Sequence, residues 1–335
     1  MLGLFDENEN PDDNNRGNLA TNTNASHEQR EAMPESDVDD TQEVDDASGD
    51  VQSDSVQKTR RPGSAATEIP QPNARREQRL EVASRCHIGS VRPRNEDTSF
   101  IFVSQAGGSE PLPVFGLFIV ADGMGGHNDG HRASKLVART VAQHILDRLY
   151  RSLLQEGQSV MQQPVQETME EAVLLANKAL AGAESGKEMG TTLTAAVILG
   201  SRLFLVHIGD SRAYLLHESN LSLVTTDHTF VQALQDAGQL TAEEAAIHPN
   251  RNLLYRALMG EAMEEPVDVF TRSLPQNGSL MLCSDGLWGA VDEATIAAIL
   301  NDDIVLQDKA DRLLSAALEA GGSDNVTVIL ASFVL

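Results

Sequence analysis

The chain of 335 residues contains few cysteines, few aromatic side chains and comparatively little positive charge. Its two cysteines, Cys86 and Cys283, stand in apolar stretches without an activating neighbour, so each is expected to be a core thiol. This low cysteine content argues against a disulfide framework and predicts a reducing compartment. Aromatic residues make up 4% of the chain, which is compatible with a core of valine, leucine, isoleucine and alanine.

Basic residues are outnumbered, with 25 lysines and arginines against 50 acidic residues and a formal net charge of −25. A protein that binds a nucleic-acid backbone needs a basic surface, so nucleic acid is excluded as a partner. No apolar run approaches the length of a transmembrane helix, and residues 1–6 lack the features of a signal peptide. The sequence therefore predicts a cytoplasmic protein that does not insert into membranes.

Residues 1–78 form a segment of different composition, rich in Asp, Glu, Asn, Gln, Ser and Pro and almost without aliphatic runs. Such a segment cannot bury enough apolar surface to offset its conformational entropy, and it is predicted to be a disordered acidic tail. It is either a solvated linker or a docking and regulatory segment. In the second case the candidate phosphoacceptors are Thr41, Ser48, Ser53 and Ser55.

Residues 79–335 are predicted to form one folded domain, near the upper size for a single core. Helical periodicity is found over residues 130–150, 165–183, 292–300 and 306–320, and Asn128 or Asp129 can cap the first of these helices. Strand-like runs cover residues 81–88, 98–103, 115–120, 191–197, 203–208, 213–217, 221–224, 267–272, 279–283 and 326–335.

The strands between residues 191 and 224 are separated by short turns, which is typical of an antiparallel meander. The irregular region 227–256 that follows holds two short helices, and Thr241 and Glu244 at the second have the spacing of a capping box. Groups of strands alternating with pairs of helices predict an α+β layered domain.

Acidic residues stand at the ends of several predicted strands. Asp122 follows a buried strand and is itself followed by Gly123, Gly125 and Gly126. A buried carboxylate needs a cation or several donors, and glycine lets a backbone carbonyl face the same partner. Because Asp-Gly is also an ordinary turn signal, this motif alone leaves a metal site and a simple loop both open. The same arrangement recurs at Glu96, Asp97, Asp210, Asp285 and Asp324.

Five acidic corners in one domain favour a common site, and carboxylates without histidine or cysteine suit Mg²⁺ or Mn²⁺. The motifs, in chain order, are Glu96-Asp97, Asp122-Gly123-Met124-Gly125-Gly126, Gly190-Thr191-Thr192, Gly209-Asp210-Ser211-Arg212-Ala213-Tyr214, Ser284-Asp285-Gly286 and Asp324-Asn325. This series resembles the metal-dependent protein phosphatases of the PP2C family in their bacterial form. The resemblance implies a four-layer αββα sandwich, in which two antiparallel sheets are flanked by helix pairs.

The resemblance also implies a protein serine/threonine phosphatase in which a hydroxide bridging two Mg²⁺ or Mn²⁺ ions attacks phosphoserine or phosphothreonine. Asp122 would bridge the ions, and Asp210 with Asp285 would hold a third, weaker ion. The metal ligands implied by the resemblance are Glu96, Asp122, the Gly123 carbonyl, Asp285, Asp324 and Asp210.

Further roles follow from the same resemblance. Asp97 would orient a metal-bound water, and Arg92 would bind the substrate phosphate through its guanidinium fork. Arg94 is a rival to Arg92, but Pro93 separates the two and sends them in different directions. The alternative for either arginine is a solvated surface side chain. Asn325 is expected to support Asp324 or the turn, and Gly190-Thr191-Thr192 is interpreted as a strand start.

The general acid is less well defined, because some family members carry a histidine directly after the Asp-Gly pair and this chain has Met124 there. His127 can protonate the leaving group, or it is a simple loop histidine. The resemblance implies that the irregular region 227–256 is a flap beside the active site, and His228 and His248 in it are expected to be structural.

The implied partners are phosphorylated proteins that bacterial Ser/Thr kinases modify, and the protein is expected to be a monomer. Two alternatives stand beside the main interpretation. One is a catalytically weak pseudophosphatase that binds phosphoproteins, and the other is a phosphatase dedicated to a single phosphoprotein that resembles a sigma-factor regulator.

Overall fold

The computed structural model describes residues 78–335 except for residues 109–110, 126–128, 157–163, 184–188 and 264. The chain divides between Ile69 and Pro70 into two units, and the described residues all belong to the second. Residues 1–77 of the predicted acidic tail therefore lie outside the described residues. Within the described ranges, no helix combines the length and the apolar character needed to cross a membrane.

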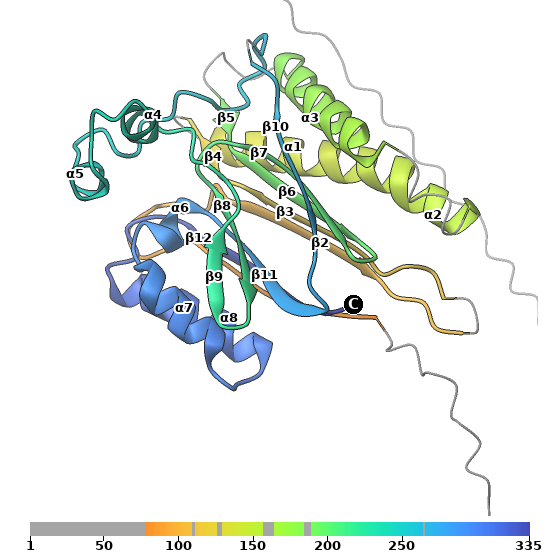
Figure 1. The fold of residues 1–335 in the computed structure, drawn as a ribbon. Helices are drawn as coiled ribbons and strands as arrows, with labels where there is room; N and C mark the ends of the chain where they lie inside the picture. The colour runs from red at the N-terminus through yellow and green to blue at the C-terminus, as the bar shows by residue number, and fades with distance from the viewer. Residues whose placement is uncertain (1–77, 109–110, 126–128, 157–163, 184–188, 264) are drawn as a thin grey trace, which may run out of the picture. The chain divides into compact units, whose positions relative to one another are not determined.

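Two five-stranded antiparallel sheets face each other in this unit (Figure 1). The first has the order β1-β12-β11-β8-β9. Its strands are β1 (Arg79–His87), β8 (Arg212–His217), β9 (Asn220–Leu223), β11 (Asn277–Cys283) and β12 (Val326–Val334). The second has the order β10-β7-β6-β3-β2. Its strands are β2 (Thr98–Ser104), β3 (Phe115–Ala121), β6 (Leu193–Leu199), β7 (Arg202–Ile208) and β10 (Asp268–Ser273).

The core between the sheets comes from the alternate residues that each strand turns inward. Phe118 and Leu205 from one sheet pack with Leu282 and Phe333 from the other, and all four are buried. Full burial of a leucine or phenylalanine side chain contributes about 1.5–3 kcal/mol. The aliphatic core predicted from the composition is present, and this apolar layer holds the two sheets face to face.

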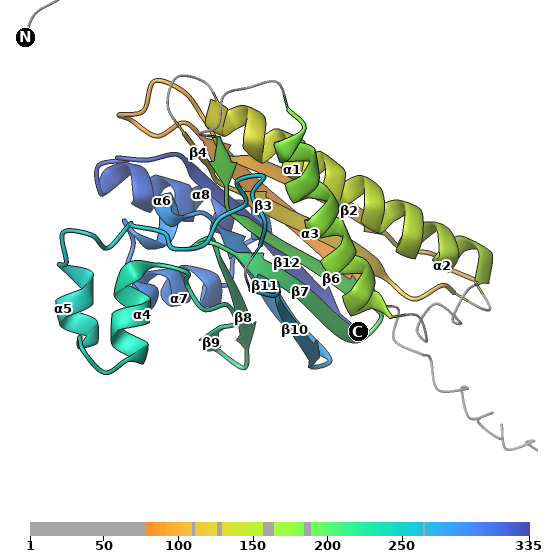
Figure 2. The same ribbon diagram turned by 90° about the horizontal axis from the view of Figure 1, so that it is seen from above.

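A helix layer covers the outer face of each sheet, as the resemblance implied. Helices α1 (Asp129–Ile145) and α3 (Val165–Ala181) lie side by side over the second sheet (Figure 2). Helices α7 (Glu293–Asn301) and α8 (Leu306–Glu319) cover the first sheet. In α1 the buried residues Ala133, Val137 and Val141 recur every fourth position, which places them on one face. The α+β prediction and the αββα order of layers are confirmed.

The first helical segment is longer than predicted. It continues beyond α1 through a π-helical turn, η1 (Leu146–Tyr150), into α2 (Arg151–Glu156). Buried Leu149 and Leu153 extend its apolar face, and no glycine or proline interrupts the chain before residue 157. The end predicted at residue 150 is therefore wrong. Asn128, one of the two predicted caps, lies outside the described residues.

The predicted meander is also wrong, because β7 and β8 belong to different sheets. Strand β7 pairs with β6 and β10, whereas β8 pairs with β9 and β11. Residues 209–211 carry the chain from one sheet to the other. Periodicity cannot detect such a change, because each strand keeps its own alternation on either side of it.

Several short elements complete the end of the sandwich that carries the acidic residues. Strands β4 (Gly123–Met124) and β5 (Gly190–Thr191) form a separate pair, and α6 (Asp285–Trp288) follows β11. Helices α4 (Phe230–Asp236) and α5 (Ala242–Ala246) lie beyond the sheets (Figures 1 and 2). The predicted capping box of α5 is confirmed, with Thr241 and Glu244 bonded reciprocally.

Candidate metal and phosphate site

The strand register brings the acidic corners of each sheet to one edge. In the second sheet Thr98 pairs with Ala121. Asp97 directly precedes Thr98 and Asp122 directly follows Ala121, so the two aspartates lie at the same edge of this sheet. In the first sheet Cys283 pairs with Val328, so Asp285 and Asp324 lie where β11 ends and β12 begins. The two edges belong to the same end of the sandwich, because the Asp122 carboxyl interacts electrostatically with Asp97, Asp285, Asp210 and Asp324.

This concentration of acids changes the ionisation of its members. Burial raises the pKa of Asp97 to about 7 and that of Asp285 to about 6, and repulsion from neighbouring carboxylates adds to both effects. The pKa values of Asp122 and Asp210 are raised well above the usual range, first by burial and then by the same repulsion. Burial and mutual repulsion thus make each of these carboxylates harder to ionise.

Two buried carboxylate oxygens of the cluster have no hydrogen-bond partner. They are Oδ1 of Asp97 and Oδ1 of Asp285. The other oxygen of Asp97, Oδ2, accepts a hydrogen bond of 2.7 Å from Ser284 Oγ. The Asp285 carboxyl interacts electrostatically with that of Asp122 from the opposite sheet. Because buried polar atoms are normally paired, these oxygens mark a place suited to a cation.

No group of three histidine, cysteine or acidic side chains in the described part of the chain is gathered into a complete metal-ligand set. A cation held here would therefore need backbone oxygen or modest shifts of the carboxylates. Hard divalent cations accept both kinds of ligand and prefer oxygen. The donor set of carboxylates and carbonyls fits Mg²⁺ or Mn²⁺ and does not fit a metal that requires thiolate.

Glu96 and the Gly123 carbonyl converge beside the first turn of α1. A Cβ added to Gly130 would lie 2.9 Å from both Glu96 Oε1 and the carbonyl oxygen of Gly123. Because residue 130 is a glycine, no side chain fills the space beside Glu96 Oε1 and the Gly123 carbonyl oxygen. These two oxygens are predicted to bind the same ion. The backbone supports this approach, since Gly123 N donates to the Glu96 carbonyl at 3.2 Å.

The backbone of Asp122 is held by two buried threonines. Asp122 N donates to Thr192 Oγ1 at 2.9 Å, and Thr192 N donates to the Asp122 carbonyl at 2.8 Å. Thr191 Oγ1 donates to the same carbonyl at 2.8 Å. Gly190 and Thr191 form the separate strand β5, and β6 begins at Leu193, so the strand predicted from residue 191 is interrupted at Thr192. The motif also fixes Asp122, a function that the sequence analysis missed.

Asn325 links the chain on both sides of Glu96. Its Nδ2 donates to the carbonyls of Ile88 at 2.8 Å and Arg94 at 2.9 Å, while its Oδ1 accepts from Glu96 N at 2.7 Å. Both polar atoms of the side chain are thereby engaged with backbone. The prediction that Asn325 supports the turn is confirmed.

The two candidate arginines differ in their contacts. Arg92 Nη2 donates to Asp324 Oδ2 at 2.6 Å, so its guanidinium lies at the acidic cluster. Arg94 is exposed, and its side chain makes no ion pair with any residue in the described ranges. Of the two arginines, Arg92 is therefore the one that contacts the acidic cluster.

Asp210 is buried on the connection between β7 and β8. The preceding residue, Gly209, has φ +109, and a Cβ there would lie 2.5 Å from the side chain of Thr192. Glycine is needed at this position for both reasons. The change of sheet that the sequence analysis missed is the feature that brings Asp210 to the cluster.

Three histidines, Met124 and Cys283 are also among the residues named in the sequence analysis. His127 lies outside the described residues, so its role as general acid stays a prediction. Met124 is half-buried and pairs with Gly190. His228 is buried and accepts a hydrogen bond from Gly209 N, whereas His248 Nδ1 accepts one from Asn250 N. Cys283 is a core thiol, as predicted.

The prediction for Cys86 is wrong, because this cysteine is exposed. It lies on the edge strand β1, and an edge strand has a neighbouring strand on one side only. Its Sγ accepts hydrogen bonds from Asn95 Nδ2 and Thr327 Oγ1, both at 3.2 Å. An apolar run therefore does not guarantee burial at the edge of a sheet.

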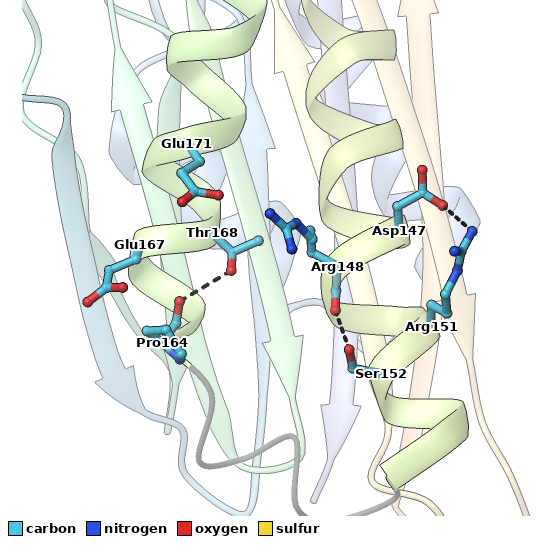
Figure 3. Close-up of a pocket in the computed structure, with 8 residues that line it drawn as sticks. All are labelled: Asp147, Arg148, Arg151, Ser152, Pro164, Glu167, Thr168 and Glu171. Atoms are coloured by element: carbon cyan, nitrogen blue, oxygen red, sulfur yellow. Dashed lines mark hydrogen bonds and ion pairs between the residues drawn. The ribbon is translucent and has the colours of Figure 1, made fainter.

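A separate cavity of about 530 Å³ lies away from the acids, between η1–α2 and the start of α3 (Figure 3). It is lined by Asp147, Arg148, Arg151, Ser152, Pro164, Glu167, Thr168 and Glu171. Its charges are mixed, and Arg151 already pairs with Asp147 at 2.9 Å. None of the predicted site residues lines this cavity.

Comparison with known proteins agrees with the geometry of the acidic cluster. Residues 95–327 match the family model of protein phosphatase 2C. The chain belongs to the protein phosphatase 2C family. This membership accounts for the two antiparallel sheets with flanking helices and for the order of the acidic motifs along the chain.

Two members of the protein phosphatase 2C family illustrate the degree of similarity. The "Serine/threonine protein phosphatase PstP" of Mycobacterium tuberculosis is 40% identical over 259 residues, which cover 76% of this chain and 45% of PstP. The "Serine/threonine phosphatase stp" of Listeria innocua is 36% identical over 251 residues, covering 75% of this chain and 95% of the relative. The chain thus spans less than half of the mycobacterial relative and nearly all of the listerial one.

The fold also matches a solved structure of this protein phosphatase 2C group. A crystal structure of the catalytic domain of PstP in complex with two manganese ions superposes with a TM-score of 0.61 at 37% sequence identity. The match covers 77% of this chain and 100% of that domain.

Proposed function

We propose that this chain is a metal-dependent protein phosphatase that hydrolyses phosphoserine and phosphothreonine in proteins. The observation that carries the proposal is the convergence of carboxylates from both sheets, with two buried carboxylate oxygens that lack partners. The names of the relatives and the two manganese ions of the PstP domain support it. The proposed phosphatase unit is residues 79–335, with residues 1–78 as a separate acidic segment.

The residues proposed to hold two Mn²⁺ or Mg²⁺ ions are Glu96, Asp122, the Gly123 carbonyl, Asp285 and Asp324, with Asp210 at a weaker third ion. When bound, such ions neutralise phosphoryl charge and supply a nucleophilic water at neutral pH. Asp122 is suited to the central position, because it interacts with acids from both sheets. Asp97, held by Ser284, is suited to orient that water.

Two further residues are proposed to act on the substrate, one by binding its phosphate and one by protonating the leaving group. Arg92 binds two phosphoryl oxygens through its planar guanidinium, which positions the phosphorus near the acids. His127 protonates the leaving serine or threonine oxygen. The physiological substrates are proposed to be proteins modified by bacterial Ser/Thr kinases, met by a monomeric enzyme in the cytoplasm. The absence of a disulfide at Cys86 and Cys283 supports a reducing compartment.

Hydrolysis of p-nitrophenyl phosphate by the full chain tests the activity. Activity should require added Mn²⁺ or Mg²⁺, disappear with EDTA and return with excess metal. Asp122→Asn and Asp285→Asn should each lower kcat by at least about a hundredfold, while the exposed Asp236→Asn serves as a matched control. A fully active Asp122→Asn, or hydrolysis unaffected by EDTA, would refute the proposal.

A panel of phosphorylated proteins then defines the substrate range. A broad phosphatase removes phosphate from many of them, whereas a dedicated one acts on a single phosphoprotein. A chain that binds these phosphoproteins without turnover is a pseudophosphatase, and that outcome would contradict the proposed activity.

A further inference from the structure

Trp288 connects two acidic residues of the candidate site. It is the last residue of α6, the short helix that begins at Asp285. Its indole Nε1 donates a hydrogen bond of 2.9 Å to the backbone carbonyl of Asp210. Asp210 and Asp285 are the two residues proposed to share the weaker third ion. Trp288 donates a hydrogen bond to Asp210 and lies on the same helix as Asp285.

The indole ring is itself fixed by a buried ion pair. The guanidinium carbon of Arg212 lies 3.6 Å from the centroid of the Trp288 ring, which is a close cation–π contact. Arg212 also forms a two-pronged ion pair with Asp227, with Nε to Oδ1 at 3.0 Å and Nη2 to Oδ2 at 2.7 Å. The Asp227 side chain is 6% exposed. Asp227, Arg212 and Trp288 therefore form one stack, which we call the indole stack.

The hydrogen bonds around Asp210 restrict the direction of its Cα–Cβ bond, from which the carboxylate extends. The Gly209 carbonyl accepts from His228 N at 2.7 Å, which orients the peptide plane before Asp210. The Asp210 carbonyl accepts from Trp288, which orients the peptide plane after it. Because each peptide is planar, fixing the planes on both sides of one Cα fixes its φ and ψ and hence its Cβ. Trp288 contributes one of the two constraints.

We infer that Trp288, held in place by Arg212 and Asp227, is a positioning residue that sets the Asp210 carboxylate against Asp285 and strengthens the third cation site. This inference rests on the proposed function. It concerns the weakest metal-binding step, because the hydrogen bond acts on Asp210, which is not among the ligands proposed for the first two ions.

Trp288→Phe tests the inference, because phenylalanine keeps an aromatic face for Arg212 and loses only the N–H donor. Calorimetric titration with MnCl₂ at pH 7 should show the weakest binding step reduced five- to tenfold, with the tighter steps within twofold of the wild type. Tyr214→Phe is the matched control. It removes a hydroxyl that accepts from Arg212 Nη1 at 3.1 Å but makes no contact with Asp210 in the described structure.

The variant Asp210→Asn separates failure of this inference from failure of the proposed ligand set. The Trp288 bond goes to the backbone of residue 210, so Asp210→Asn removes a ligand and keeps the bond. If Asp210→Asn leaves the weakest step intact, the ligand role proposed for Asp210 fails, and the inference fails with it. If Asp210→Asn abolishes that step and Trp288→Phe does not weaken it, only the positioning role is overturned.

A double variant distinguishes positioning from a general effect on folding. In an Asp210→Asn background, Trp288→Phe should cause no further change in Mn²⁺ binding, because the carboxylate it orients is gone. An additional loss there would mean that Trp288 acts on the fold, which overturns the inference. Thermal unfolding of each variant without metal measures that contribution separately.

The wild-type chain supplies an independent readout, because Trp288 is its single tryptophan. Mn²⁺ is paramagnetic, so the tryptophan fluorescence of the wild type should be quenched at the Mn²⁺ concentrations that fill the weakest site. In Asp210→Asn the same concentrations should cause no quenching. This measurement does not depend on Trp288→Phe being folded. Equal quenching in the wild type and in Asp210→Asn would contradict a third ion beside the indole.

Discussion

Arg92 and Asp324 form an ion pair at the edge of the acidic cluster, with Nη2 and Oδ2 2.6 Å apart. The residue proposed to bind phosphate therefore contacts a residue proposed to bind metal. A cation on Asp324 would compete for the carboxylate and release the guanidinium toward the substrate. We expect metal to bind before the phosphorylated substrate for this reason.

Arg92→Ala should raise KM for a phosphopeptide about tenfold, because a charge-assisted contact to phosphate is worth roughly 1.5–3 kcal/mol and the site is partly solvated. The same variant should bind Mn²⁺ slightly more tightly, since it removes a positive charge beside Asp324. Steady-state kinetics and calorimetry measure the two effects. Arg94→Ala is the matched control, and a larger change in KM there than in Arg92→Ala would reverse the proposed roles.

Gly130→Ala should impair metal binding without unfolding the domain. In most helical positions this substitution stabilises by about 0.5–1 kcal/mol. At residue 130 the added Cβ would lie 2.9 Å from Glu96 Oε1 and from the Gly123 carbonyl oxygen, so both must move. Calorimetry should show Mn²⁺ affinity reduced at least about tenfold.

Gly182→Ala provides the comparison for Gly130→Ala. Gly182 is the C-cap of α3 with φ −86, and a Cβ there would have no atom closer than 3.8 Å. Its Mn²⁺ affinity should equal that of the wild type. Equal affinities for Gly130→Ala and Gly182→Ala would show that the space beside Glu96 does not matter for metal.

Asn325→Ala should loosen the segment that carries Arg92 and Glu96. The substitution leaves the carbonyls of Ile88 and Arg94 and the N–H of Glu96 without their side-chain partner. Loss of such buried bonds costs about 1–3 kcal/mol. Urea unfolding should show that decrease, and hydrogen exchange should become faster in residues 88–97. Unchanged exchange in this segment would contradict the supporting role of Asn325.

His207 should make the domain sensitive to acid. Burial lowers its pKa from 6.5 to about 3, with His228 adding to the effect, so the folded state keeps the ring neutral. Below pH 6.5 His207 binds a proton in the unfolded chain but stays neutral in the folded chain. The free energy of unfolding therefore falls as the pH decreases toward 3. At pH 4.5 this one group should cost about 3 kcal/mol, following from ~1.4 kcal/mol per pH unit.

Urea unfolding at pH 7 and pH 4.5 measures the effect, with His207→Gln as the variant that cannot titrate. The loss of stability between the two pH values should be smaller in His207→Gln, and the contributions of other groups cancel in the comparison. Parallel curves for the two proteins would show that His207 is not kept neutral by the fold.

The acids of the candidate site could be predicted from the sequence because their geometry follows from strand register. Asp97 precedes β2 and Asp122 follows β3, and antiparallel pairing of these neighbours places them at one edge. Helices α1 and α3 could also be predicted from the sequence, since apolar residues recur every three to four positions in each of them. Both inferences depend on patterns local to one segment or to two adjacent ones.

The supporting residues could not be predicted, because their roles exist only after distant segments meet. Gly130 matters through Glu96, and Trp288 through the Asp210 carbonyl. The Thr192 contacts to Asp122 join residues 70 positions apart. The change of sheet takes place over residues 209–211, and the alternation of the strands on either side does not reveal it. Cys86 was misjudged because an apolar run does not indicate whether its strand is central or at an edge.

The acids come from two sheets that pack on each other through the apolar layer represented by Phe118 and Phe333. Sliding or tilting of one sheet over the other would separate Asp122 from Asp285 even if both strands stayed intact. The relative position of these two carboxylates is thus set by hydrophobic side chains that are not part of the proposed site. Volume changes deep in that layer, such as Phe118→Leu, would change the spacing of the proposed metal ligands before they unfolded the domain.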